Sequence, residues 1–114
     1  KQIRKAISKI NRLMDQFENY ETYLNKDLMQ DALIKNIELV GEDVYRMTND
    51  IKNSFPEIPW GKVEKMRYLL IHQYHDVHLK TVWDTALYHI PEFEKELNRV
   101  ERWIDAQKKT GFSR

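Results

Sequence analysis

The spacing of apolar residues constrains this chain more than any other feature of its sequence. Apolar side chains recur every three or four residues over most of its length, and no stretch sustains the strict alternation of a half-buried strand. This spacing gathers them along one face of a helix, where they can pack against neighbouring helices. The pattern therefore predicts an all-α fold, an antiparallel bundle of four or five helices.

The first half of the chain is expected to form two helices. The first ends near Leu24, and the second carries one long apolar stripe from Leu33 to Ile51. Asn25 and Asp27 are both suitable N-cap residues for this second helix. Gly41 falls inside it, where glycine costs about 1 kcal/mol relative to alanine. We expect this glycine to permit the close approach of a neighbouring helix.

Prolines divide the second half of the chain. Pro56 and Pro59 disfavour helical structure in the residues that precede them. A third helix is therefore expected after them, at about residues 60–74, and a fourth around residues 82–87. Pro91 suits the first turn of a helix, and we expect a fifth segment to begin there.

Length and composition set the limits for function. At 114 residues the chain suits one compact domain, so residues 1–114 are treated as a single helical unit. The net charge of +1 is not that of a general nucleic-acid binder, so any RNA site must be a local patch. The absence of cysteine excludes thiolate chemistry and fits a reducing, cytoplasmic setting. No apolar run has the length of a membrane span, so no membrane partner is expected.

The third predicted helix carries one arginine and one histidine on either side of an apolar run. The side chains from Tyr68 to Ile71 would cover every side of a helix, and one of those sides is expected to be a subunit interface. Arg67 and His72 lie about 140° apart around an ideal α-helix. A bend near His72, or a second copy of the helix across a two-fold axis, is needed to bring both to one atom. Arg67 and Tyr74 lie nearly on one line of the helix.

Arginine and histidine together suit the cleavage of RNA without a metal or another cofactor. His72 titrates near neutral pH and can move the proton of a ribose 2′-hydroxyl or of the leaving oxygen. Arg67 stays charged and can hold the phosphate through paired hydrogen bonds. Because the 2′-hydroxyl is the nucleophile, no protein serine or cysteine is required. The alternative is a structural pair, in which each residue satisfies the other or a helix end.

The arrangement Arg67-x-x-x-x-His72-x-Tyr74 resembles the defining motif of HepT toxins in the HEPN superfamily. Further landmarks occur in the family's order and approximate spacing, over about residues 28–97. They are Gln30-Asp31-Ala32, Gly41-Glu42, Pro56-Glu57-Ile58-Pro59-Trp60, Met66-Arg67, Val82-Trp83 and Ile90-Pro91. The resemblance implies an all-α endoribonuclease, the toxin of a toxin–antitoxin pair, that forms a homodimer with two motifs in one cleft. It also implies an MntA-type minimal nucleotidyltransferase antitoxin, which silences the toxin by adding AMP to Tyr74.

Tyr68 departs from the family's pattern, because a small or polar residue commonly follows the motif arginine. If Tyr68 only packs, Tyr68→Asn should change stability more than rate. If it has displaced a group that orients the phosphate, the same substitution should raise cleavage. The departure also leaves a second function open, that of an attenuated or non-catalytic HEPN module that binds a nucleotidyltransferase partner or RNA.

Three further sets of side chains have a functional and a plainer interpretation. Histidines at steps of three can bind zinc, but the residues between them here resemble a turn, and no metal site is predicted. Tryptophans can stack on bases, although at helical spacing they more often form core. Lysines beside the motif can steer RNA or simply lie on a solvated face. The sets are His72, His75 and His78; Trp60, Trp83 and Trp103; and Lys62, Lys65 and Lys80.

Overall fold

The computed structural model describes residues 2–68 and 79–109, and within these ranges the chain forms helices and no strand. The elements are α1 (Gln2–Asp15), α2 (Tyr20–Leu24), α3 (Asp27–Tyr45), α4 (Asn49–Ser54), α5 (Trp60–Glu64), the 3₁₀-helix η1 (Lys65–Tyr68), α7 (Leu79–Asp84), the π-helix η2 (Thr85–His89) and α8 (Ile90–Lys109). The predicted all-α helical bundle is confirmed. In the same ranges, no helix has both the length and the apolar character that crossing a membrane requires.

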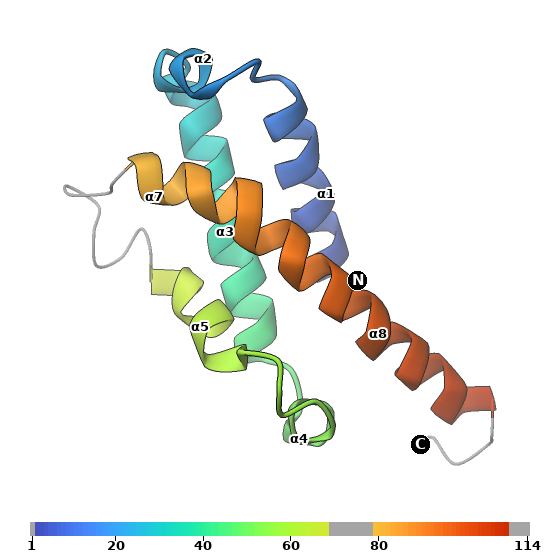
Figure 1. Ribbon diagram of the computed structural model, residues 1–114. Coiled ribbons are helices and arrows are strands. Elements are labelled where there is room, and N and C mark those ends of the chain that lie inside the picture. Colours follow the sequence, from blue (N-terminus) through green and yellow to red (C-terminus); the bar gives the residue numbers. More distant parts are fainter. Residues whose placement is uncertain (1, 69–78, 110–114) are drawn as a thin grey trace.

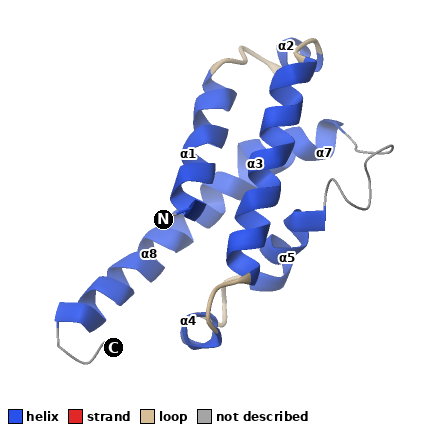
Figure 2. Ribbon diagram, turned by 180° about the vertical axis from the view of Figure 1, so that it is seen from behind, coloured by secondary structure: helices blue, strands red, loops and turns tan. Residues whose placement is uncertain are grey.

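Helix α3 is the centre of the bundle. It contacts α1, α2, α5, η1 and α7. Helices α1 and α3 run antiparallel and are connected at one end through α2 (Figure 1). Helices α7, η2 and α8 form one rod that crosses this pair obliquely, and the C-terminal part of α8 extends beyond the other helices (Figures 1 and 2). The antiparallel arrangement therefore holds for α1 and α3, while the third long rod crosses them at an angle.

The apolar stripes of these helices meet in a single core. Fully buried side chains come from α1, α3 and the α7–α8 rod, and each contributes about 1.5–3 kcal/mol relative to an exposed position. They include Ile10, Leu33, Ile37, Val40, Val82, Ile90 and Val100. Helix α1, helix α3 and the α7–α8 rod therefore share one core, and buried apolar side chains hold the rod against the other two helices.

The first predicted helix ends too late in the sequence. Helix α1 stops at Asp15, and α2 is a separate short helix that ends at Leu24. The break is explained by Asn19, which adopts an extended backbone and caps α2. Its side-chain oxygen accepts a hydrogen bond from the Thr22 backbone N–H at 2.9 Å. The Asn19 cap therefore starts a new helix, where the apolar spacing alone had predicted that the first helix continues.

The second predicted helix was also too long. Helix α3 ends at Tyr45, and Ile51 belongs to α4, which begins after the extended N-cap residue Thr48. Helices α3 and α4 both direct apolar side chains toward the core, so one stripe is shared by two helices. Asn25 ends α2, so it does not cap α3. Asp27 is the first residue of α3, where its side-chain oxygen accepts a hydrogen bond of 2.9 Å from the Leu28 backbone N–H, and Lys26 holds the N-cap position.

Pro91 does not start a separate helical segment after a break. The rod continues through it, and the five residues before Ile90 form the π-helix η2. Proline has no N–H, and its ring clashes with the carbonyl four residues earlier in a regular α-helix. The wider turn relieves this conflict, because the Ile90 N–H bonds to the Thr85 carbonyl, five residues back. Helices α7, η2 and α8 thus follow one another as a continuous helical rod (Figure 1).

Candidate functional site

The segment that carries Arg67 is not the regular α-helix that the sequence predicts. Helix α5 ends at Glu64, and the chain continues as the 3₁₀-helix η1 to Tyr68. The α-helical angle between Arg67 and His72 therefore does not apply at the arginine itself. His72 and Tyr74 lie outside the described residues.

Gly41 fixes how closely this segment approaches α3. A Cβ atom on Gly41 would lie 2.4 Å from the Arg67 backbone nitrogen and 3.0 Å from backbone atoms of Met66 and Val63. No side chain fits at these distances, so only glycine permits the observed contact. The predicted close approach is confirmed. Because the contact is made to backbone atoms, α3 sets the position from which the Arg67 side chain starts.

The Arg67 side chain contacts two aromatic rings, that of Tyr45 at the end of α3 and that of Tyr68 in η1. Its Cζ atom lies 3.7 Å from the ring centroid of Tyr45 and 4.3 Å from that of Tyr68. These are cation–π distances, at which the flat guanidinium group also stacks on the ring. Nη1 donates to the Glu64 carbonyl at 3.3 Å, and Nη2 donates to the Tyr68 hydroxyl. The side chain is partly exposed, so it is held at the surface.

This environment leaves much of the guanidinium's binding capacity unused. Of its five N–H donors, two are engaged by the Glu64 carbonyl and the Tyr68 hydroxyl, which leaves three without a partner among residues 2–68 and 79–109. No carboxylate of those ranges forms an ion pair with Arg67, although eight ion pairs join other residues there. An oriented cation with free donors is suited to bind an oxyanion such as a phosphate.

Tyr68 is part of this arrangement and not of the core. Its side chain is 36% exposed, its ring faces the Arg67 guanidinium, and its hydroxyl accepts a hydrogen bond from it. The residue therefore contacts the arginine directly, which neither of the two sequence alternatives had included. The effect of Tyr68→Asn on cleavage stays a prediction.

A second anchoring contact lies at the start of α7, on the C-terminal side of the motif. The Tyr23 hydroxyl donates a hydrogen bond of 2.8 Å to the carbonyl of Leu79, the first residue of α7. Tyr23 is fully buried, and burial raises the pKa of its hydroxyl, so it stays protonated as a donor. The ring of Trp83 packs 5.0 Å from that of Tyr23. The start of α7 is therefore fixed by the aromatic core, just as η1 is fixed by Gly41.

Two further residues of this region lay outside the predicted site. Tyr45 stacks on Arg67. Lys52 of α4 contacts both the end of α3 and the end of α5. Lys52 Nζ lies 2.8 Å from a carboxylate oxygen of Glu64 and 3.5 Å from the Tyr45 carbonyl. One sequence signal pointed to Tyr45: it lies four residues after Gly41, and so on the same face of α3. No spacing rule indicated Lys52, because its partners belong to other elements.

The tryptophans and lysines are placed as follows. The Trp60 indole N–H donates to the carbonyls of Lys52 and Phe55, and Trp103 packs edge-on against Phe55. Together with Trp83 in the aromatic core, all three tryptophans serve helix packing. Lys80 pairs with Asp84 at 2.9 Å. Within the described ranges no three metal-binding side chains gather, and the three histidines of the predicted zinc alternative lie outside those ranges.

Lys62 and Lys65 line a cleft of about 660 Å³ between α5–η1 and the η2–α8 part of the rod. Its floor is apolar, and His89 of the π-helix and two glutamates of α8 complete its wall. The two lysines and two glutamates balance in charge. The lining residues are Pro59, Lys62, Val63, Lys65, Met66, Thr85, His89, Glu92, Phe93 and Glu96.

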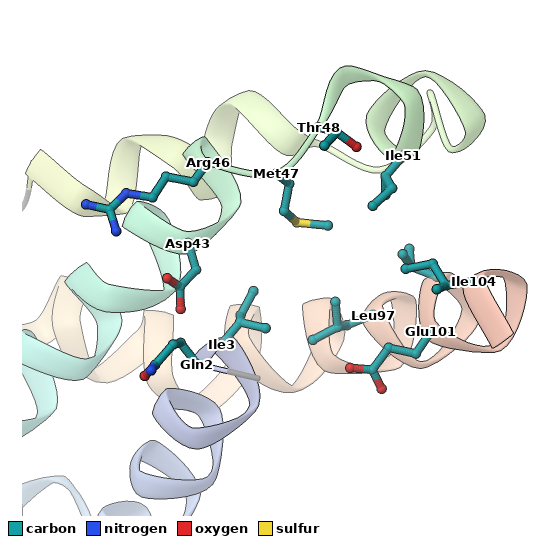
Figure 3. Close-up of a pocket in the computed structure, with 11 residues that line it drawn as sticks. Gln2, Ile3, Asp43, Arg46, Met47, Thr48, Ile51, Leu97, Glu101 and Ile104 are labelled. Carbon is teal, nitrogen blue, oxygen red and sulfur yellow. The ribbon is translucent and has the colours of Figure 1, made fainter. Parts of the chain in front are cut away.

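A separate cleft of about 320 Å³ opens between the start of α1, the α3–α4 turn and α8. Apolar side chains such as Met47 and Leu97 face one another across it, and Asp43 and Glu101 lie at its edge (Figure 3). Burial raises the pKa of Asp43, and nearby Arg46 lowers it by less. Arg67 does not line this cleft, so the cleft is separate from the candidate site around Arg67.

Comparisons with known proteins agree on one family. A family model described as "Ribonuclease HepT-like" matches residues 3–100. Two proteins of Methanocaldococcus jannaschii, each named "Putative RNase", are 38% identical over 88 residues and 40% identical over 82 residues. The matches cover 77% and 72% of this chain, and 73% and 71% of the relatives.

A relative in Thermococcus cleftensis, named "Probable ribonuclease HepT", is 32% identical over 83 residues, which is 73% of this chain and 76% of the relative. No solved structure matches the chain. The family model spans most of the chain, including Gly41, Arg67 and the start of α7, and agrees with the resemblance carried by the motif. The chain therefore belongs to the ribonuclease HepT-like family.

Proposed function

We propose that this protein is a metal-independent endoribonuclease in which Arg67 binds the scissile phosphate and His72 transfers protons. The observation that carries this proposal is the state of Arg67. It is oriented by two aromatic rings and a backbone carbonyl, and within residues 2–68 and 79–109 three of its donors have no partner and no carboxylate pairs with it. The names of the relatives support ribonuclease activity as the class of reaction.

The proposed reaction needs only RNA and these two side chains. The ribose 2′-oxygen attacks the adjacent phosphorus while His72, or its counterpart in a second copy, removes the hydroxyl proton. The bond from phosphorus to the 5′-oxygen of the next nucleotide breaks, and that oxygen takes a proton from an imidazolium. The products are a 2′,3′-cyclic phosphate and a free 5′-hydroxyl. Arg67 stabilises the negative charge that builds on the phosphate oxygens.

An RNA cleavage assay in buffer with a chelator tests the proposal. The wild-type protein should cleave RNA and leave a cyclic phosphate or its hydrolysis product. His72→Ala should lose most activity, since general acid–base catalysis is commonly worth about 10²–10⁴ in rate. His89→Ala is a matched control, because His89 is a histidine of the η2 segment outside the motif. Equal cleavage by wild type and His72→Ala would overturn the proposed role.

Assembly and regulation extend the proposal. We infer a homodimer that brings two motifs together, cytoplasmic action as the toxin of a toxin–antitoxin pair, and silencing by an MntA-type nucleotidyltransferase. The acceptor of AMP would be Tyr74, where added phosphates would repel an RNA phosphate from Arg67. Tyr74→Phe keeps the ring but removes the acceptor oxygen. Co-expressed with the antitoxin, the wild type should gain adenylate mass on Tyr74, and Tyr74→Phe should escape both modification and silencing.

One observation favours a second function, that of a binding module with weak or no catalysis. The Tyr68 hydroxyl occupies a donor of Arg67, and Tyr68 stands where the HepT motif that this sequence resembles commonly has a small or polar residue. If this contact competes with the phosphate, the protein would bind RNA or its partner and cleave slowly. Tyr68→Asn distinguishes the two functions, because it should raise cleavage only where the tyrosine restrains Arg67.

A further inference from the structure

We propose that Tyr45 is a positioning residue, which holds the guanidinium plane of Arg67 in the orientation that binds the phosphate. The proposal rests on the proposed function, since it assigns Arg67 a phosphate to bind. Tyr45 is not part of the sequence motif and comes from a different helix. Of the two rings that contact the guanidinium within residues 2–68 and 79–109, that of Tyr45 is nevertheless the nearer, at 3.7 Å against 4.3 Å for Tyr68.

Helix α3 controls both the backbone and the side chain of Arg67. The Arg67 backbone nitrogen packs against Gly41, and the Arg67 guanidinium packs against the ring of Tyr45, one turn later in α3. The two contacts lie about one helical turn apart along α3. A side chain held at its start and at its end has few conformations left, so the orientation exists before any ligand binds.

The backbone of Tyr45 is held by contacts with its neighbours. It is the last residue of α3, and the helix is closed by the Arg46 N–H, which bonds to the Glu42 carbonyl. Lys52 contacts both the Tyr45 carbonyl and the Glu64 carboxylate, and the Glu64 carbonyl accepts from Arg67 Nη1. These contacts join α3, α4 and α5 around the arginine. Tyr45 and Arg67 are therefore parts of one connected unit.

The stacking geometry determines which donors stay available. A ring over the face of a guanidinium leaves its N–H groups, which lie in the plane, free to point outward. Phosphate oxygens bind along that edge, often with two parallel hydrogen bonds. The Tyr45 side chain is 54% exposed, so the stacked pair lies where a ligand can reach it. Since the ring is occupied by the arginine, Tyr45 is better placed to orient Arg67 than to stack on a base.

Three variants separate the ring from its hydroxyl and from general surface effects. Tyr45→Phe keeps the ring, Tyr45→Leu removes it, and Tyr88→Leu is a matched control at another exposed tyrosine. The first readout is the NMR signal of the Arg67 side chain in the free protein, assigned with Arg67→Lys. An overlying ring should shift it upfield in the wild type and Tyr45→Phe, and the shift should shrink in Tyr45→Leu. This readout does not depend on RNA.

The second readout is kinetic. On an RNA oligonucleotide in buffer with a chelator, Tyr45→Leu should lower kcat/KM about tenfold, the size expected for losing a favourable cation–π contact. Tyr45→Phe and Tyr88→Leu should stay within about twofold of wild type. Affinity for a 2′-O-methyl oligonucleotide, which cannot be cleaved, should follow the same order. An unchanged Arg67 signal in Tyr45→Leu, or a loss in Tyr45→Phe equal to that in Tyr45→Leu, overturns the proposal.

The two proposals fail in different ways. If the wild-type protein binds the 2′-O-methyl oligonucleotide but does not cleave RNA, the proposed ribonuclease activity is overturned. The affinities of the Tyr45 variants for that oligonucleotide then still test the role of Tyr45. Cleavage by the wild type at a rate that Tyr45→Leu matches removes the role of Tyr45 and leaves the ribonuclease intact. A wild type that neither binds nor cleaves RNA overturns both.

Discussion

Arg4 and Arg67 are both partly buried arginines with several contacts, but those contacts differ in kind. Arg4 of α1 is surrounded by oxygens of α8: it donates to Glu101 at 2.8–3.1 Å, to Glu94 at 3.4 Å and to Asn98. Its hydrogen bond to Glu101 is the main cause that raises the pKa of Arg4. Arg67 instead contacts two aromatic rings, one carbonyl and one hydroxyl.

This difference separates a structural arginine from one available to a ligand. The charge of Arg4 is neutralised by two carboxylates, and its contacts join the first and last helices of the chain. The contacts of Arg67 within the described part of the chain orient the guanidinium, and none of them is with a carboxylate. Aromatic rings and carbonyls leave a net positive group at the surface, which is the state that attracts a phosphate. Burial and contact number alone would not distinguish these two residues.

Among substitutions outside the motif, the largest expected effect comes from Gly41→Ala, which should displace Arg67. The added Cβ would meet backbone atoms of Arg67, Met66 and Val63 and cannot be relieved by turning a side chain. Because displacing a catalytic group by about 1 Å can cost 10²-fold, we expect cleavage to fall by about that factor. Overpacking should also outweigh the gain of about 1 kcal/mol in helix propensity and lower the melting temperature.

Gly61→Ala is the control for that substitution. Gly61 also lies within a helix, but a Cβ there meets nothing within 4 Å. This variant should keep full cleavage and be equally or slightly more stable, by up to about 1 kcal/mol. Wild-type cleavage by Gly41→Ala would show that the close approach of η1 to α3 is not needed for activity.

Arg4→Ala should lower stability and leave cleavage unchanged, the opposite of what we expect for a change at Arg67. It removes a partly exposed ion-pair network, so after allowance for solvent screening we expect a loss of roughly 1–2 kcal/mol in the free energy of unfolding. The rate of RNA cleavage by the folded protein should not change. Denaturant unfolding and the cleavage assay measure the two quantities, and Arg12→Ala on the exposed face of α1 is the control. A large drop in cleavage at full folding would remove the distinction between the two arginines.

A smaller effect is expected from Tyr23→Phe, which tests a structural contact between neutral groups. The substitution removes the hydrogen bond to the Leu79 carbonyl and keeps the ring in the aromatic core. The free energy of unfolding should fall by about 1 kcal/mol, as for a typical hydrogen bond. Tyr20→Phe, in the same cluster, should change it by less than about 0.5 kcal/mol. Equal stabilities of the two variants would mean that the hydroxyl does not anchor α7.

The helical content followed from the sequence, but the helix ends did not. The stripe from Leu33 to Ile51 is real, and its last residues reach the core from a separate helix. Periodicity reports which side chains are buried and not whether one helix carries them. Asn19 caps α2 through its side chain, and the extended backbone of Thr48 separates α4 from α3, so each stripe is divided between two helices. The passage of the rod through Pro91 needed a π-helical turn, which no apolar pattern marks.

The site was predictable to the extent that single residues or short spacings define it. Arg67 followed from the motif, and the close approach at Gly41 followed from a glycine inside a helix. The contacts of Tyr45 and Lys52 with Arg67 and Glu64 depend on how three helices pack. Pairings of that kind leave no periodic trace in one sequence. His72 and Tyr74 stay predictions, since they lie outside the described residues.

The most direct test of the account compares Arg67→Ala with Arg4→Ala in a single-turnover RNA cleavage assay with a chelator. Removing a group that stabilises transition-state charge typically costs about 10²–10³ in rate, and we expect that loss for Arg67→Ala, with an unchanged melting temperature. Arg4→Ala should melt earlier and cleave at the wild-type rate under conditions where it is folded. Cleavage by Arg67→Ala at the wild-type rate would contradict the central claim that this arginine binds the scissile phosphate.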